Sequence, residues 1–156
     1  MLVKFNKLSN NSRLWIYASH KKLDYLQQKE ILKRLEIFLN EWKYHQKPLT
    51  ASVTILEDYF IIVALESLEN EVGGCSIDSL QRFIQDLESK LNLSLLNRLN
   101  LFCRIDNNIK CIPLNILIDN ANLDTMFYDL TIQTKAELNT YLKPIREGWC
   151  KKFFMS

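Results

Sequence analysis

The sequence predicts an α+β fold with an antiparallel sheet, built on a ferredoxin-like βαββαβ core with a C-terminal β-α extension. Two observations carry this prediction. Strand-sized apolar segments alternate with two long helical patterns in the order β-α-β-β-α-β, and each helical pattern has one apolar stripe. Helices of that kind cover one face of a sheet. We expect the 156 residues to form a single domain, with the core at 13–105 and the extension at 106–156.

The predicted core starts with a half-buried strand at residues 13–18, in which two sets of side chains alternate. One set is Leu14, Ile16 and Ala18, and the other is Arg13, Trp15 and Tyr17. A helical pattern follows over residues 24–44, with apolar residues three and four positions apart. Apolar segments at 53–56 and 59–65 then flank Glu57-Asp58, which predicts two strands joined by a tight hairpin.

The second helical pattern begins just after Cys75, where Asp78 and Gln81 have the spacing of a capping box. It ends at Asn92, and residues 99–105 are predicted as the fourth core strand. The extension is predicted to contain a strand at 109–112, a short helix at 113–118, a strand at 127–132 and a helix from residue 134 that Pro144 interrupts.

Charge and composition limit the partners and the location that we expect. The net charge is +2, from 20 basic and 18 acidic residues, which is too balanced for an electrostatic nucleic-acid binder. No apolar run approaches the roughly 18 residues of a membrane helix, and residues 1–7 lack the apolar stretch of a signal peptide. We therefore expect a cytoplasmic protein without a membrane partner, whose four cysteines are reduced thiols.

The candidate functional site is the stretch from Gly73 to Ser79, which opens with two of the three glycines of the chain. Glycine allows close backbone approach, and free N–H groups at a helix start bind phosphate or carboxylate. We therefore predict a ligand- or partner-facing loop formed by six residues: Gly73, Gly74, Cys75, Ser76, Asp78 and Ser79. The alternative is a structural turn, with Ser76 or Asp78 capping the helix and Cys75 buried.

A second hypothesis makes Cys75 a reactive thiol. A helix N-terminus stabilises a thiolate, so Cys75 is a candidate catalytic nucleophile or redox sensor, with His20 as its candidate base. The cysteines are widely spaced and form no CxxC pair, which argues against a metal site. The sequence also lacks the GxxxxGK[ST] and GxGxxG motifs, so we predict no cofactor and no P-loop ATPase activity. Enzyme activity of another kind stays open.

Arg13, Trp15 and Tyr17 are candidate partner-binding residues. Aromatic residues on a ferredoxin-like sheet can stack on single-stranded RNA, but residues 58–63 lack the aromatic alternation of RNA-binding sheets. We therefore rank nucleic acid as the least favoured partner, and expect the C-terminal extension or a second subunit to cover this face. A basic aromatic segment near the C-terminus packs on the domain or docks on a partner; it contains Arg146, Trp149, Lys151, Lys152, Phe153 and Phe154.

Four stretches together resemble a small bacterial protein family that often carries the label ABC transporter ATPase. They are residues 12–17, 74–79, 134–137 and 149–153, of which Gly-Cys-Ser-Ile-Asp-Ser at 74–79 is the most specific. The resemblance covers nearly the whole chain and implies no activity, substrate or catalytic residue. An ABC ATPase needs a Walker A loop and a signature motif, which this chain lacks. We therefore expect a binding or assembly module that forms a homodimer or binds another protein.

Overall fold

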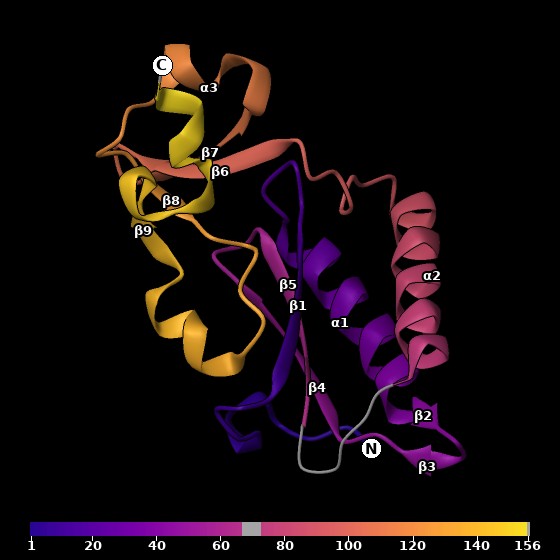
Figure 1. Cartoon of the computed structure of the whole chain (residues 1–156). Coiled ribbons are helices and arrows are strands. Elements are labelled where there is room, and N and C mark those ends of the chain that lie inside the picture. Colours follow the sequence, from indigo (N-terminus) through magenta and orange to yellow (C-terminus); the bar gives the residue numbers. More distant parts are fainter. Residues whose placement is uncertain (67–72, 156) are drawn as a thin grey trace. The chain divides into compact units, whose positions relative to one another are not determined.

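The computed structural model describes residues 1–66 and 73–155, which form two compact units (Figure 1). Unit 1 contains residues 1–96 and 133–136, and unit 2 contains residues 97–132 and those from 137 onward. The division between the units falls at residue 96, before the core boundary that we predicted near residue 105, and the organisation into one domain stays a prediction. None of the helices in the described ranges is long and apolar enough to cross a membrane.

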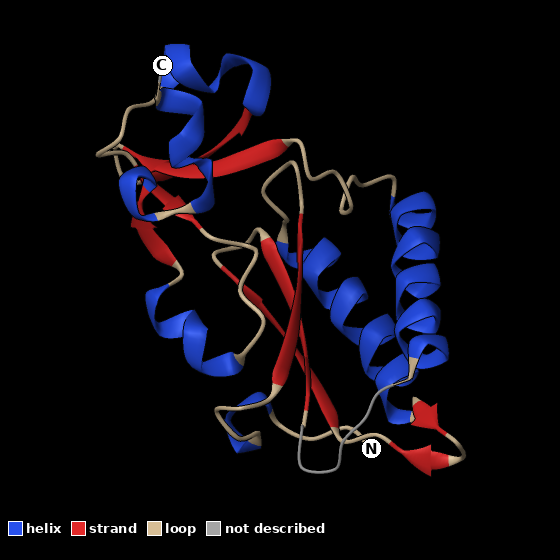
Figure 2. Ribbon diagram, in the orientation of Figure 1, coloured by secondary structure: helices blue, strands red, loops and turns tan. Residues whose placement is uncertain are grey.

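Unit 1 is a three-stranded antiparallel sheet with two long helices on one face (Figure 2). The strand order is β1 (Arg13–Ala18), β5 (Phe60–Leu65) and β4 (Ala51–Leu56). Helices α1 (Tyr25–Asn40) and α2 (Gly74–Leu91) bury their apolar stripes in the same cluster as the sheet. A small hairpin, β2 (Lys43–Tyr44) with β3 (Lys47–Pro48), follows α1. The predicted α+β class with antiparallel sheets is confirmed.

The predicted fourth core strand is absent from this sheet. Residues 100–105 form β6 (Asn100–Ile105), which pairs along its whole length with β7 (Asn108–Pro113) and, on its other edge, with β8 (Met126–Tyr128). The local hairpin is favoured because the positive φ angles of Asp106 and Asn107 let β6 turn straight into β7. Our prediction that residues 99–105 extend the first sheet is therefore wrong.

Residues 133–136 lie beside β1 instead. Thr134 forms an antiparallel bridge with Arg13, and the N–H group of Leu14 donates to the carbonyl of Gln133 over 2.9 Å. The ammonium group of Lys135 donates to the carbonyls of Phe5 and Leu8 at 3.0 and 2.7 Å. This late segment therefore belongs to the packing of unit 1.

The aromatic face of β1 points toward the helices. Tyr17 is 3% exposed and Trp15 packs against the same cluster, where its ring lies 6.0 Å from that of Trp42 in an edge-on arrangement. Our expectation that the C-terminal extension or a second subunit covers this face is wrong. Alternation alone could not assign the face, because the other set, Leu14 and Ile16, is buried as well.

Unit 2 is a four-stranded antiparallel sheet in the order β7, β6, β8 and β9 (Leu142–Pro144). The connections of unit 2 contain one short α-helix, α3 (Leu117–Asn120). Four 3₁₀ helices lie in or beside these connections, at Leu114–Ile116, Lys135–Thr140, Ile145–Glu147 and Trp149–Phe154. The segment after residue 134 that we predicted as a helix is thus 3₁₀. The hydrophobic core of unit 2 consists of Leu101, Cys103, Ile112, Leu117, Phe127, Ile145 and Cys150.

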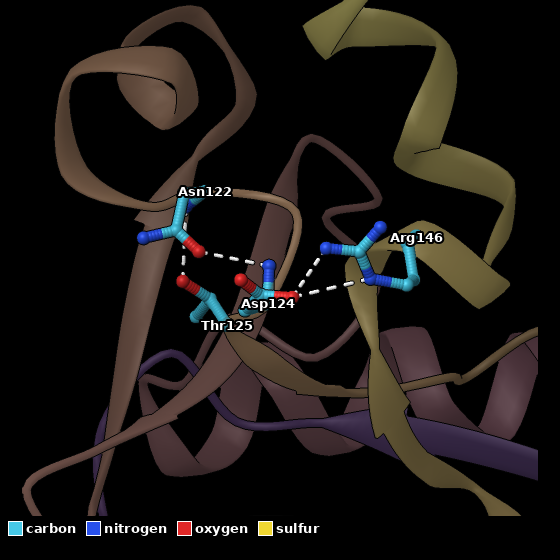
Figure 3. A network of polar contacts seen from close by, with 4 residues as sticks. All are labelled: Asn122, Asp124, Thr125 and Arg146. Atoms are coloured by element: carbon cyan, nitrogen blue, oxygen red, sulfur yellow. Dashed lines mark hydrogen bonds and ion pairs between the residues drawn. The ribbon is translucent and has the colours of Figure 1, made fainter.

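A polar turn joins α3 to β8 (Figure 3). The side-chain oxygen of Asn122 accepts from the N–H group of Asp124 at 2.8 Å, and the N–H group of Asn122 donates to the Thr125 hydroxyl at 2.9 Å. The guanidinium group of Arg146 donates two hydrogen bonds to one carboxylate oxygen of Asp124, the one from Nε being 3.1 Å long. The Asp124 side chain is 80% exposed, so the pair fixes the turn and contributes little stability.

Candidate functional site

The predicted loop lies at the start of α2. Gly73 is the N-cap residue in an extended conformation, and the helix begins at Gly74. Asp78 lies inside the helix and is exposed, and among residues 1–66 and 73–155 no side chain caps the first turn. The predicted caps by Ser76 or Asp78, and the capping box with Gln81, are therefore wrong. The reason is that the helix starts earlier than the apolar pattern suggests.

The two adjacent glycines have different roles. A Cβ atom on Gly73 would lie 2.2 Å from a ring carbon of Tyr44, so a side chain at this position would force the Tyr44 ring to move. A Cβ atom on Gly74 would have no neighbouring atom within 4 Å. Neither glycine has a positive φ angle. Glycine is therefore favoured at position 73 by the close approach of the Tyr44 ring and not by a left-handed backbone conformation. At Gly74 the absence of a side chain leaves open space at the helix start.

Ser76 and Trp42 tie the β2–β3 hairpin to the helix. The Ser76 hydroxyl donates to the carbonyl of Lys43 at 2.8 Å, and the indole N–H group of Trp42 donates to the carbonyl of Ser76 at 3.0 Å. Ser76 is 4% exposed, and the Ser79 hydroxyl donates to its carbonyl at 2.8 Å. These two serines of the predicted ligand set thus hold the local structure together, and their hydroxyls are engaged within it.

Three of the six predicted residues remain open to solvent, namely Gly74, Cys75 and Asp78. The N–H groups of Ser76 and Ile77 donate to the carbonyl of Gly73. Those of Gly74 and Cys75 have no acceptor among residues 1–66 and 73–155. A first turn of this kind carries a partial positive charge and accepts an anion.

The hairpin adds residues outside the six that we predicted as the ligand-facing loop. Lys43, His45 and Lys47 are exposed on the β2–β3 hairpin, which Ser76 and the Tyr44 ring hold against the helix start. The His45 ring lies 4.1 Å from the Tyr44 ring. The turn uses positive φ angles at His45 and Gln46 without a glycine. A pattern search for glycine turns therefore overlooks it.

The structure separates Cys75 from its candidate base. The Nδ1 atom of His20 accepts from the N–H group of Ser94, and the N–H group of His20 donates to the carbonyl of Ser94, both at 3.2 Å. Ser94 follows the C-terminal end of α2, whereas Cys75 is in its first turn. A helix of this length spans about 27 Å at 1.5 Å per residue. The histidine on the side of Cys75 is His45.

The remaining thiols lie in unit 2. Burial raises the pKa of the Cys103 thiol to about 12, with help from the neighbouring Cys150 and Cys111 thiols. Burial also raises the pKa of Cys150 to about 11, to which the Asp129 carboxylate contributes, and it raises that of Cys111. Cys75 is the exposed thiol. Within the described residues, no group of three acidic, His or Cys side chains is arranged to hold a metal ion.

The aromatic candidates do not form an open surface. Tyr17 is buried, Trp15 is half-buried, and the exposed guanidinium group of Arg13 lies 5.0 Å over the Trp15 ring. A half-buried ring with a guanidinium group over it offers little surface on which a nucleic-acid base can stack.

Searches of family models, of curated proteins and of solved structures find no match for this chain. The family resemblance therefore stays a prediction, and the function is inferred from the geometry of the site.

Proposed function

We propose that this protein is a small, non-catalytic binding or assembly module. Its binding surface would be the open first turn of α2 together with the β2–β3 hairpin, and its target an anionic group, a phosphate or a carboxylate, on a ligand or a protein partner. One observation carries the proposal. Within the described part of the chain, the helix start has no side-chain cap and leaves the N–H groups of Gly74 and Cys75 open, yet it is fixed in place by Ser76 and Trp42.

Local charge and rigidity support an anionic target. Free N–H groups and the helix dipole attract negative charge, and Lys43 and Lys47 stand on the hairpin that is bonded to this turn. Asp78 opposes them, one turn further along the helix. Because Gly74 has no neighbours in contact, an anion can approach the backbone closely.

A thiol-dependent enzyme or redox sensor is the second candidate, favoured by the exposure of Cys75 in the first turn. The distance of His20 from Cys75 removes the base that the sequence suggested, which leaves His45 on the hairpin as the histidine on that side. The Cys75→Ser variant separates the two functions. A binding module keeps its affinity for the anion, whereas thiol chemistry is abolished.

Two expectations from the sequence belong to the same proposal. One is a cytoplasmic location with reduced thiols. The other is a relationship of unit 1 to the ferredoxin-like arrangement, with residues 133–134 in the place of the fourth strand. The order β1-β5-β4 and the antiparallel bridge between Arg13 and Thr134 support it.

The test is an amide NMR titration with inorganic phosphate. We expect saturable shifts centred on the Gly74 and Cys75 amides, at millimolar phosphate. A Lys43→Gln/Lys47→Gln variant should weaken binding several-fold. The matched control is Lys29→Gln/Lys33→Gln, which removes the same charge from the exposed face of α1. Shifts that spread over all lysines, or equal losses in the two variants, would refute the proposal.

A further inference from the structure

The imidazole of His45 is exposed on the β2–β3 hairpin and has no polar partner. Among residues 1–66 and 73–155 its side chain makes no hydrogen bond and no ion pair. The second histidine of the chain, His20, is held by Ser94, whose N–H group donates to its Nδ1 atom at 3.2 Å. Histidine is the side chain that ordinarily changes its charge between about pH 5 and 8. The hairpin therefore carries an imidazole without a neighbour that fixes its protonation.

Two ring contacts place this imidazole close to the start of α2. The centre of the His45 ring lies 4.1 Å from that of the Tyr44 ring. The Tyr44 ring lies against Gly73, where a Cβ atom would be 2.2 Å from a ring carbon. Together with the size of the Tyr44 ring, these distances put the His45 ring within about 10 Å of the Cα atom of Gly73, which is about one Debye length at 0.1 M salt. A positive charge on His45 therefore acts on an anion at the first turn of the helix.

The backbone of the turn fixes the position of His45 but does not require an imidazole there. His45 and Gln46 have φ angles of 50° and 66° between β2 and β3. Asparagine and glycine are the usual residues of a two-residue turn with positive φ angles. The turn itself is anchored, since the Ser76 hydroxyl donates to the carbonyl of Lys43 at 2.8 Å. His45 thus stands at a fixed place beside the helix start, and asparagine can replace it without strain in the turn.

We propose that His45 is a further anion-binding residue of this site, and that its imidazole takes up a proton when the anion binds. The inference rests on the proposed function, because it needs an anion at the N–H groups of Gly74 and Cys75. A protonated imidazole attracts that anion and a neutral one does not, so the affinity rises as the pH falls. Linkage is reciprocal, so a bound anion favours the protonated imidazole by the same factor.

Other charged and titratable groups surround the hairpin. Those on the described elements next to it are Glu41, Lys43, Tyr44, Lys47, Cys75, Asp78 and Arg82. Carboxyl groups ordinarily titrate below about pH 5, and thiol, phenol, ammonium and guanidinium groups above about pH 8. The Met1 amino group also lies nearby, since it donates to the carbonyl of Leu49 after β3, and burial lowers its pKa. A variant of His45 itself is therefore needed to assign any pH dependence between these limits.

Amide NMR titrations of the full chain with sodium sulfate test the proposal. Sulfate stays a dianion near neutral pH, whereas phosphate groups titrate there. At constant ionic strength, the affinity read at Gly74 and Cys75 should rise about threefold from about pH 7.5 to about pH 5.5, as expected for one added charge at this distance. His45→Asn should bind at every pH as weakly as the unchanged protein does at the higher pH. The control Lys29→Gln/Lys33→Gln should keep the pH dependence.

Ring NMR signals of the unchanged protein keep the test decisive if the His45→Asn hairpin does not form. Sulfate should move the titration midpoint of the His45 ring to higher pH and leave that of His20 in place, because Ser94 holds His20 beyond the other end of α2. An unmoved His45 midpoint, or a pH dependence that persists in His45→Asn, would overturn the inference and leave the proposed function standing. The absence of saturable shifts at Gly74 and Cys75 at every pH would overturn both.

Discussion

The first turns of α1 and α2 both contain backbone N–H groups without a partner inside the helix, and the two helices treat these groups differently. Asp24 begins α1 with a complete capping box, in which its carboxylate accepts from the N–H group of Gln27 at 2.8 Å and its own N–H group donates to the Gln27 side chain at 3.0 Å. Gly73 begins α2 with no side chain. Both helices pack on one face of one sheet. Packing on the sheet therefore does not require an uncapped helix start. The β2–β3 hairpin holds the start of α2 in place, and the N–H groups of Gly74 and Cys75 stay available.

The largest expected effect concerns the thiol in the open turn. At pH 8 a thiol with a pKa of about 12 is ionised in about one molecule in 10⁴, and burial blocks access as well. We expect iodoacetamide to label Cys75 at least a hundredfold faster than Cys103 or Cys150, as read by mass spectrometry. Equal rates for all three in the native protein would contradict the closed core of unit 2.

Gly73→Ala should be the most damaging of the single substitutions at the helix starts. The new methyl group would lie within the Tyr44 ring, and overpacking of this kind costs about 1–3 kcal/mol of unfolding free energy in urea denaturation. Gly74→Ala is the control and should be neutral or slightly stabilising, because it meets open space. If the two variants lose equal stability, the contact with Tyr44 does not account for the presence of glycine at position 73.

Ser76→Ala should cost about 1–1.5 kcal/mol, since it leaves the carbonyl of Lys43 without its donor at a part-buried position. Trp42→Phe, which removes the other bond of the hairpin to the helix, should cost a similar amount. We also expect Ser76→Ala to weaken the phosphate shifts at Gly74, because the first turn loses its support. Intact binding in this variant would show that the hairpin is not needed.

Asp24→Ala should have the smallest effect, about 1 kcal/mol, which is typical for loss of an N-cap. The measurement is again urea denaturation. It should leave the phosphate titration at Gly74 unchanged, since α1 starts elsewhere in unit 1. A change in phosphate binding would mean that the two helix starts are coupled.

Much of unit 1 could be predicted because its elements are local. The apolar stripe of α1, with Ile31, Leu35 and Leu39 buried, follows from helical periodicity, and the hairpin at Glu57-Asp58 follows from its flanking strands. The capping box at Asp24 is readable from residue type and spacing as well, although we predicted only the false one at Asp78.

The rest depended on contacts between distant residues. Gly73 can be understood only with Tyr44 beside it, and Ser76 only with the carbonyl of Lys43. Residue types and their local spacing do not show which distant residues become neighbours in the fold. The face of Trp15 and the sheet of β6 escaped prediction for a related reason, since strands that are buried on both sides give no period that selects one face.

Residues 133–136 make the assembly of unit 1 a late event in synthesis. Lys135 bonds to the carbonyl of Phe5, 130 positions earlier in the chain, and the neighbouring bridge to Arg13 spans nearly as far. A ribosome must therefore complete β6, β7 and β8 before β1 receives this neighbour. Until then a nascent chain exposes this edge of β1, and a fragment that ends at residue 96 should be prone to aggregation.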